Sequence, residues 1–175
     1  GIAIDNNLLW PSVDGIDIAS SCDVIVSDCR IETGQDAISI KTYPSSRACE
    51  RVCISNCLIR SSGSGIRIGP ESWQDIRQIV ISNCVVHRSA HAFAIAVLNG
   101  GSCEDIVVSN LVSDDIGGSA TAKAAVLFDL RRGSDNDTMG RISDVAMHNV
   151  AIRSDGRIVM AAEDGGVIRN VSLRD

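Results

Sequence analysis

A short strand-like pattern recurs along this chain at a nearly constant step, and this repeat constrains the fold more than any other feature. Four clear copies, each ending in Asp-Cys, Asn-Cys or Asn-Leu, start 28, 27 and 27 residues apart, at Val24, Val52, Ile79 and Ile106. Two weaker copies follow after steps of 39 and 26, at Val145 and Val171. The longer step predicts an insertion, which we place in the polar segment 131–137 because it has the composition of a loop.

A second motif accompanies the first and alternates with period two, which is typical of a strand. Its copies are Gly15-Ile16-Asp17-Ile18, Ala37-Ile38-Ser39-Ile40, Gly65-Ile66-Arg67-Ile68 and, more loosely, Phe93-Ala94-Ile95-Ala96. Each repeat therefore holds two or three short strands joined by polar turns, with no amphipathic segment long enough for a crossover helix. Stacking such repeats predicts an all-β fold, a single right-handed parallel β-helix of about six coils.

Stacked coils place equivalent residues above one another. We expect Ile18, Ile40 and Ile68 to form an aliphatic ladder inside the solenoid, and a thiol ladder to form from Cys29, Cys57 and Cys84. A row of asparagines is expected at the boundary between strand and turn, where amides can hydrogen-bond along the stack: Asn56, Asn83, Asn110 and Asn149.

Composition excludes several classes of protein. Sixteen Lys and Arg against 22 Asp and Glu give a net charge of −6, which opposes nucleic-acid binding. No apolar stretch is long enough to span a membrane. The cysteines show no CxxC spacing, and the three histidines lie in strand-like surroundings, so we predict neither a metal site nor a cofactor.

The length of 175 residues predicts one domain over residues 1–175. Because an open coil leaves unpaired backbone edges and the sequence shows no capping segment, we expect a fragment that lacks one or both end caps. Flanking segments or self-association through the coil ends would cover these edges.

Stacking in register would place Asp14, Asp36 and Ser64 on consecutive coils, with the two carboxylates about 5 Å apart. Two acids this close can activate water or handle a sugar hydroxyl. The alternative reading is that an aspartate before a small residue only forms a turn.

The segment from Val13 to Ile18, followed by Thr33-Gly34-Gln35-Asp36-Ala37-Ile38-Ser39-Ile40-Lys41, resembles the polygalacturonase family, glycoside hydrolase family 28. The resemblance extends through Ile66-Arg67-Ile68-Gly69-Pro70-Glu71-Ser72 and the Ile-Ser-Asn-Cys repeats, and so covers most of residues 10–112. It implies a right-handed parallel β-helix, secreted or periplasmic, that hydrolyses acidic pectin-like polysaccharide with inversion through three acidic residues and without a metal.

The resemblance also implies roles for individual residues. Asp14 matches the Asp of an Asn-Thr-Asp-Gly motif and Asp36 the second Asp of a Gly-Asp-Asp motif, so both would activate the attacking water. Gln35 stands where the family has its acid, and Ser64 where it has the histidine of Gly-His-Gly. An amide cannot donate a proton as a carboxylic acid does. Ala94-Ile95-Ala96 likewise replaces an Arg-Ile-Lys motif.

Two functions remain open at this point. In the first, the chain is a divergent glycosidase in which Glu71 acts as the acid, Lys41 and Arg67 hold a substrate carboxylate, and Gln35 and Ser64 line the binding site. In the second, catalysis has been lost, and the β-helix binds glycan or serves as a structural or adhesive stalk.

Overall fold

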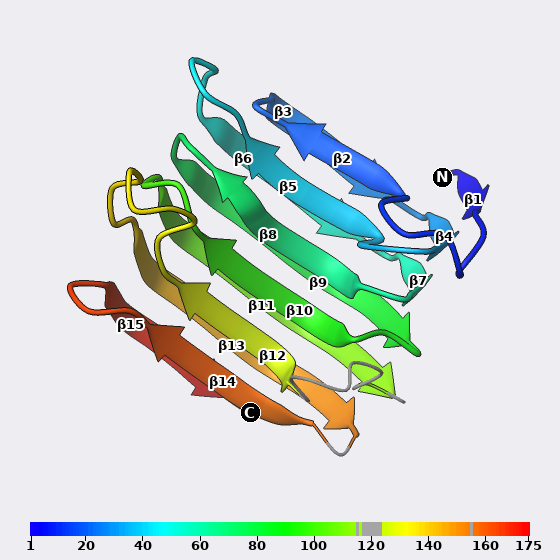
Figure 1. Ribbon diagram of the computed structural model, residues 1–175. Coiled ribbons are helices and arrows are strands. Elements are labelled where there is room, and N and C mark those ends of the chain that lie inside the picture. Colours follow the sequence, from blue (N-terminus) through cyan, green and yellow to red (C-terminus); the bar gives the residue numbers. More distant parts are fainter. Residues whose placement is uncertain (115, 117–123, 155) are drawn as a thin grey trace.

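The computed structural model describes residues 1–114, 116, 124–154 and 156–175, and in these ranges the chain forms strands joined by turns (Figure 1). Six strands make one sheet: β2 (Ile16–Ala19), β5 (Ile38–Thr42), β8 (Ser64–Ser72), β10 (His91–Val97), β12 (Ala124–Leu130) and β14 (Arg157–Ala162). Nine strands make the other: β1 (Ala3–Asp5), β3 (Cys22–Ser27), β4 (Arg30–Thr33), β6 (Cys49–Ser55), β7 (Leu58–Ser61), β9 (Ile76–His87), β11 (Ser102–Asp114), β13 (Arg141–Arg153) and β15 (Val167–Arg174).

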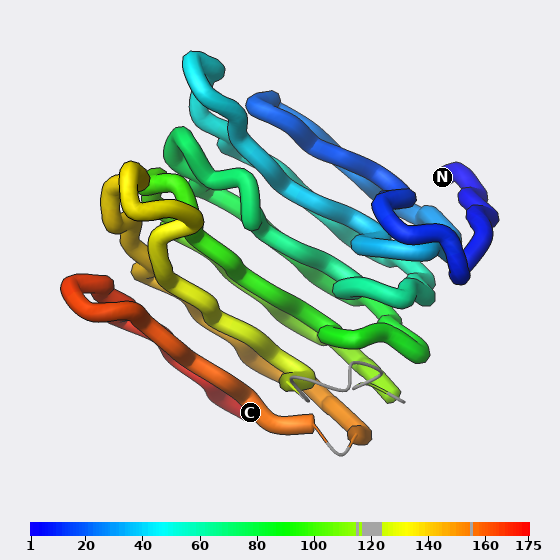
Figure 2. The backbone as a smooth tube through the Cα atoms, in the orientation of Figure 1, coloured from blue at the N-terminus to red at the C-terminus, as the bar shows by residue number. Residues whose placement is uncertain are grey.

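Every neighbouring pair of strands is parallel, and each strand lies on its counterpart in the next repeat. The six-stranded sheet has the order β14-β12-β10-β8-β5-β2, so the backbone winds through six coils, as the tube in Figure 2 shows. This arrangement confirms the predicted right-handed parallel β-helix. None of the described residues lies in a helix that is long and apolar enough to cross a membrane.

A corner divides the nine-stranded sheet into two faces. The strands β9, β11 and β13 run through this corner, whereas the corner separates β3 from β4 and β6 from β7. One residue at the corner of each of five coils has a left-handed backbone with φ between 51° and 57°: Asp28, Asn56, Asn83, Asn110 and Asn149. Asparagine and aspartate tolerate this conformation better than most residues, so the corner selects them.

The side chains at this corner form the predicted asparagine ladder. Each amide donates to the residue one coil below, with Nδ2–Oδ1 distances of 3.2, 3.4, 2.8 and 2.6 Å from Asn56, Asn83, Asn110 and Asn149 in turn. Because each oxygen accepts while the amide nitrogen donates onward, the row hydrogen-bonds in series along the stack. The ladder therefore fixes the register of the coils at the corner.

The interior is filled by aliphatic side chains stacked in columns. Ile18 pairs with Ile40 and Ile40 with Ile68, and none of the three is more than 4% exposed. Cys29, Cys57 and Cys84 are buried just inside the corner as predicted, and each thiol donates to the carbonyl two residues earlier. The aliphatic and thiol ladders are both confirmed.

The extra residues of the long repeat fall partly before β12 and partly after it. Phe93 pairs with Val126, 33 positions further on, whereas Ser102 pairs with Arg141, 39 positions further on. Part of the insertion therefore precedes β12, and only the remainder lies in the polar segment after it. The chain can lengthen on either side of a strand without disturbing the stack. Composition alone therefore located only the more polar part of the insertion, the one after β12.

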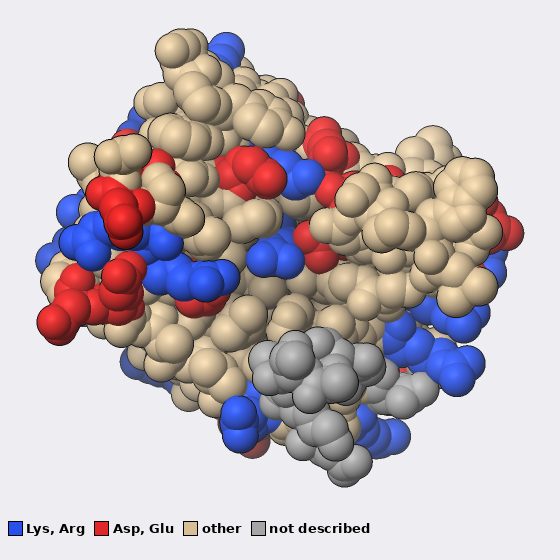
Figure 3. Space-filling view, in the orientation of Figure 1, with Lys and Arg blue, Asp and Glu red and all other residues tan. Residues whose placement is uncertain are grey.

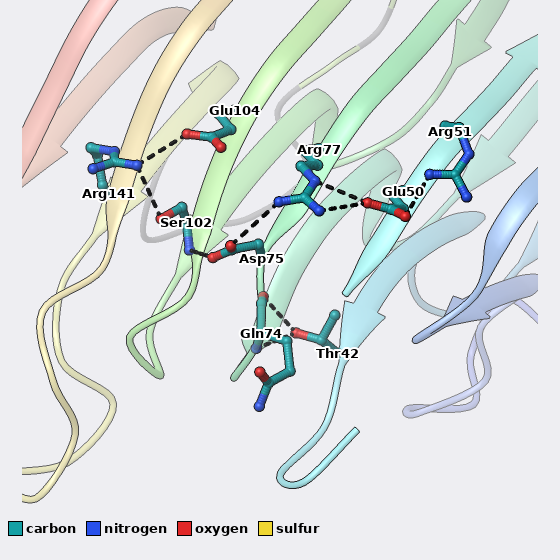
Figure 4. A network of polar contacts seen from close by, with 9 residues as sticks. All are labelled: Thr42, Glu50, Arg51, Gln74, Asp75, Arg77, Ser102, Glu104 and Arg141. Atoms are coloured by element: carbon teal, nitrogen blue, oxygen red, sulfur yellow. Dashed lines mark hydrogen bonds and ion pairs between the residues drawn. The ribbon is translucent and has the colours of Figure 1, made fainter. Parts of the chain in front are cut away.

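Charged side chains of alternating sign follow another edge of the stack (Figure 4). Glu50, Arg77 and Glu104 pair in register on three successive coils, and Arg77 Nη2 lies 2.8 Å from Glu50 Oε2. Arg141 Nη2 lies 3.1 Å from Glu104 Oε2. Because a displacement of one strand along its neighbour would separate these paired opposite charges, this row also favours the observed register.

The coil formed by β14 and β15 exposes residues that continue the interior columns. Ile158 and Met160 of β14 are 48% and 43% exposed, whereas Val126 and Phe128, their partners in β12, are fully buried. A cavity of about 400 Å³ opens at this coil and is lined in part by Val126 and Ile158. The solenoid therefore presents an apolar surface at this end.

The asparagine ladder gives the first testable prediction. Replacing Asn83 by Ala removes its hydrogen bonds to Asn56 and Asn110 and places a less tolerant residue at φ 54°. We expect a loss of about 2 kcal/mol in the free energy of unfolding, measured in urea. Asn83→Gly should lose only about half as much, because glycine adopts this backbone freely. Equal losses in the two variants would show that the backbone conformation contributes nothing.

Candidate active site

The outer face of the six-stranded sheet carries most of the residues singled out from the sequence. Figure 3 views this face from outside and shows acidic and basic side chains together in a hollow over β2, β5 and β8, between two raised walls. The outward row across these strands consists of Asp17, Ser39 and Arg67, followed on β10 by Ala94. Alternation along each strand explains this row, because every second residue of a strand points away from the core.

Four polar residues form a column where the chain enters this sheet. The backbone N–H of Asp36 donates to Asp14 Oδ1 at 3.1 Å, and the backbone N–H of Ser64 donates to Asp36 Oδ1 at 2.6 Å. Ser64 in turn pairs with His91 on the next coil. The structure thus places Asp14, Asp36 and Ser64 on consecutive coils, and each carboxylate is oriented by the backbone of the coil that follows.

Lys41 connects the first carboxylate of this column to the outward row. Its Nζ lies 2.7 Å from Asp14 Oδ2 and 3.1 Å from Asp17 Oδ1, and only 11% of its side chain is exposed. Burial alone would lower the pKa of Lys41, but the hydrogen bonds to the two carboxylates outweigh it and raise the pKa. Burial raises the pKa of Asp17, and the hydrogen bond from Lys41 offsets part of that rise. Lys41 therefore keeps two neighbouring acids together.

Asp36 is the most deeply buried acid of the column, with 3% of its side chain exposed. The Arg67 Nη1 atom lies 3.6 Å from Asp36 Oδ2, so one carboxylate oxygen is bound by backbone and the other faces a cation. Gly63 makes room for this carboxylate, because an added Cβ would lie 2.7 Å from Asp36 Oδ1. Within the described residues, Ser64 Oγ and Arg67 Nε are buried without a hydrogen-bond partner. Both atoms therefore retain an unused hydrogen-bonding capacity just beneath the surface of the hollow.

Glu71 lies on β8 of the same sheet, at an irregularity in the pairing with β5. Ile40 pairs with Ile68, but Thr42 pairs with Ser72, so β8 holds two extra residues opposite the Lys41 position. Such bulges redirect side chains and are common beside active sites. The Oε2 atom of Glu71 is buried and has no hydrogen-bond partner in the part of the chain that the structure describes.

Gln35 takes part in the site through its backbone. Its N–H donates to the Val13 carbonyl at 3.0 Å, and its own carbonyl accepts from Gly63 N at 3.1 Å. It thus lies directly before Asp36 and joins three consecutive coils, and its side chain is an amide, which does not donate a proton as a carboxylic acid does.

Sequence reasoning missed two residues of this face, Asp17 and His91. Asp17 could have been found from the alternation of Gly15-Ile16-Asp17-Ile18, since it is the outward residue of that strand. His91 could have been found by continuing the column past Ser64 by one step of 27 residues. Its Nδ1–H donates to the Ala124 carbonyl at 2.6 Å, which fixes the ring. No group of three or more His, Cys, Asp or Glu in the described residues is arranged to hold a metal ion.

Comparison with known proteins identifies the family. The model of glycosyl hydrolases family 28 matches residues 1–104, which include the whole column of polar residues and the strands that carry it. The chain belongs to glycosyl hydrolases family 28. This family 28 chain is similar to a probable polygalacturonase of Arabidopsis thaliana. The two sequences are 30% identical over an alignment that covers 37% of this chain and 19% of the plant protein.

A solved structure supports the fold of this family 28 chain. The crystal structure of a hyperthermoactive exopolygalacturonase from Thermotoga maritima superposes with a TM-score of 0.53 at 21% sequence identity. The superposition covers 92% of this chain and 44% of the exopolygalacturonase. The family 28 chain therefore spans less than half the length of each of these two relatives.

The ion pairs of Lys41 give a prediction for stability. Lys41→Met leaves Asp14 and Asp17 as neighbouring, partly buried acids without their shared cation. We expect a loss of about 2 kcal/mol in the free energy of unfolding at neutral pH. As a control, Arg30→Met removes an ion pair in which 55% of the arginine side chain is exposed, and should cost less than about 1 kcal/mol.

The effect of Lys41→Met should depend on pH. Without Lys41 the pKa of Asp17 rises further in the folded state, because the hydrogen bond that lowers it is gone. A raised folded-state pKa of an acid destabilises the fold above that pKa and has no effect below the unfolded value of about 3.9. The loss should therefore shrink as the pH falls toward about 4, in urea titrations at several pH values. A loss that is constant with pH would exclude this electrostatic cause.

Proposed function

We propose that this chain forms the substrate-binding face of a pectin-acting glycoside hydrolase, which cleaves O-glycosidic bonds in acidic polysaccharide by inversion. The observation that carries the proposal is the column in which Asp14 and Asp36 are adjacent and hydrogen-bonded through the Asp36 backbone. Membership of family 28 supports the type of reaction. The names of the two relatives, both polygalacturonases, support a galacturonate-containing substrate.

Asp14 and Asp36 would together activate the attacking water. A carboxylate base must be held in place and must keep an oxygen directed at the water. Asp36 is held through Oδ1 by the Ser64 backbone, which leaves Oδ2 as the atom that can accept a proton. Arg67 Nη1 faces this same oxygen, so a substrate would have to draw the guanidinium away before water can reach Asp36.

Glu71 would donate the proton to the leaving oxygen in place of the missing acid at Gln35. Its position on the β8 bulge puts it on the strand that also carries Ser64 and Arg67. Its Oε2 has no hydrogen-bond partner within the described residues, so a sugar oxygen could pair with this atom once ligand binding uncovers it. An inverting glycosidase places its two acidic groups about 6.5–9.5 Å apart, with sugar and water between them. Proton transfer from Glu71 and water attack assisted by Asp36 would together complete the hydrolysis.

Lys41 and Arg67 would bind the carboxylate of the substrate, and Gln35 and Ser64 would line the site beside it. Arg67 suits this role because its Nε is buried without a partner, and a guanidinium can bind a carboxylate through two parallel hydrogen bonds. A substrate carboxylate that engaged Arg67 would compete with Asp36 for the guanidinium. Substrate binding would thereby free the proposed base.

A second candidate function is glycan binding without hydrolysis. Two observations favour it. Gln35 stands at the position of the family's acid, and the Arg67 guanidinium faces the Asp36 oxygen that would otherwise accept a proton. Under this function the same face would bind polysaccharide, and the carboxylates would serve as hydrogen-bond acceptors for sugar hydroxyls. The two functions differ in whether Asp36 is needed for turnover or only for binding.

Asp36→Asn separates these functions. The substitution keeps an oxygen that can accept from the Ser64 backbone, so the fold should persist, but it removes the base. We expect the release of reducing sugar from polygalacturonic acid to fall at least about 100-fold. Asp164→Asn, in an exposed turn, is the matched control and should retain full activity. Unchanged turnover in Asp36→Asn would remove this residue from the mechanism.

Gln35→Asp tests which residue donates the proton to the leaving oxygen. If the parent already hydrolyses polygalacturonic acid through Glu71, Glu71→Gln should abolish turnover, and Gln35→Asp should restore it in that background. If only Gln35→Asp releases reducing sugar, the parent binds glycan without cleaving it. Both readings are obtained from the same reducing-end assay, run on the parent, the two single variants and the double variant.

A further inference from the structure

The few aromatic residues of this chain are divided between the core and one surface. The two phenylalanines, Phe93 and Phe128, are fully buried and meet edge to face with ring centres 6.4 Å apart. Trp10, Tyr43 and Trp73, which are the only other aromatic residues, are 64%, 43% and 40% exposed. Tryptophan is highly buried on average, so this exposure calls for an explanation.

Tyr43 and Trp73 occupy equivalent places on neighbouring coils. Tyr43 directly follows β5 and Trp73 directly follows β8, and the preceding residues Thr42 and Ser72 pair with each other. The same two strands carry Lys41, Arg67 and Glu71. Tyr43 lies two residues past Lys41, or about 7 Å along the strand direction. Both aromatic residues therefore lie at the ends of the two strands that carry charged side chains of the hollow.

The backbone around both aromatic residues is fixed by hydrogen bonds between coils. The Thr42 hydroxyl donates to the Gln74 carbonyl at 3.0 Å and accepts from the Gln74 N–H at 2.9 Å, a reciprocal contact visible in Figure 4. The Ser72 hydroxyl accepts from the Leu98 N–H at 2.8 Å. The Tyr43 N–H donates to the Ser46 hydroxyl at 3.1 Å. These contacts fix the backbone on which the two rings are carried before any ligand arrives, which reduces the entropic cost of ordering it on binding.

We propose that Tyr43 and Trp73 form a stacking platform for sugar rings of the polysaccharide that the charged hollow binds. This inference rests on the proposed function. The C–H face of a pyranose ring is apolar while its edge is hydroxylated, and an exposed Tyr or Trp offers a matching flat apolar face with a polar edge. The contact is independent of charge, so it adds affinity for an acidic polymer that the net charge of −6 would otherwise repel.

Calorimetric titration with a long oligogalacturonide tests the platform. Trp73→Ala and Tyr43→Ala should each weaken binding by about tenfold, because each removes one ring face. Trp73→Phe and Tyr43→Phe keep a flat ring without the polar edge and should stay within about threefold of the parent, which separates stacking from hydrogen bonding. Leu58→Ala removes an apolar side chain that is 51% exposed on a different face and should leave binding unchanged.

A fluorescence measurement provides a second reading that needs no catalysis. Trp10→Phe leaves Trp73 as the only tryptophan, and the oligogalacturonide should then shift or quench its emission with the calorimetric dissociation constant. If the parent binds and hydrolyses the oligosaccharide but both alanine variants bind like the parent, the platform is wrong and the proposed function stands. A parent that binds no pectic oligosaccharide would overturn both. If the emission of Trp73 responds to a protein partner but not to the oligosaccharide, this surface binds protein and not polysaccharide. That result would also overturn the platform.

Discussion

The structure depends on one constraint: each coil must lie in register on the next. Parallel backbone hydrogen bonds do not by themselves select a register, because a strand displaced along its neighbour makes the same bonds. In this chain the selection comes from the corners and edges. The asparagine ladder joins coils through amides that need a partner at a fixed height, and the row of Glu50, Arg77 and Glu104 places opposite charges in contact. The interior isoleucine columns are then buried.

The candidate site follows from this register. Residues that are 22 and 28 positions apart in the chain become neighbours only because their coils are stacked, and the backbone N–H of one coil orients the carboxylate of the previous one. Asp36 illustrates how strongly the fold controls its chemistry, since one oxygen is bound by backbone and the other faces Arg67. Both cations of the hollow, Lys41 and Arg67, already face its own aspartates, so a ligand must compete with internal ion pairs as well as with water.

Much of the fold could be predicted because a repeat converts sequence spacing directly into spatial adjacency. The aligned copies of the two motifs, 27 or 28 residues apart in most coils but 22 apart between Ile18 and Ile40, were sufficient to place the isoleucine, cysteine and asparagine ladders and to bring Asp14, Asp36 and Ser64 together. The partners of these residues were harder to foresee. Whether Lys41 binds one aspartate or two depends on side-chain conformation, and the two extra residues of β8 beside Glu71 alter the local register without changing the repeat. His91 was missed because its copy of the motif is weakly similar to the others.

The small outward residues of the six-stranded sheet have a consequence for how this surface can change. Ser39 and Ala94 stand on either side of Arg67 in one row, yet the backbone bonds and the interior packing beneath all three are the same. Both small side chains are nevertheless fully covered by their surroundings, so a larger side chain at either position would have to displace its neighbours. These two residues therefore set how much space the Arg67 side chain has on either side of it.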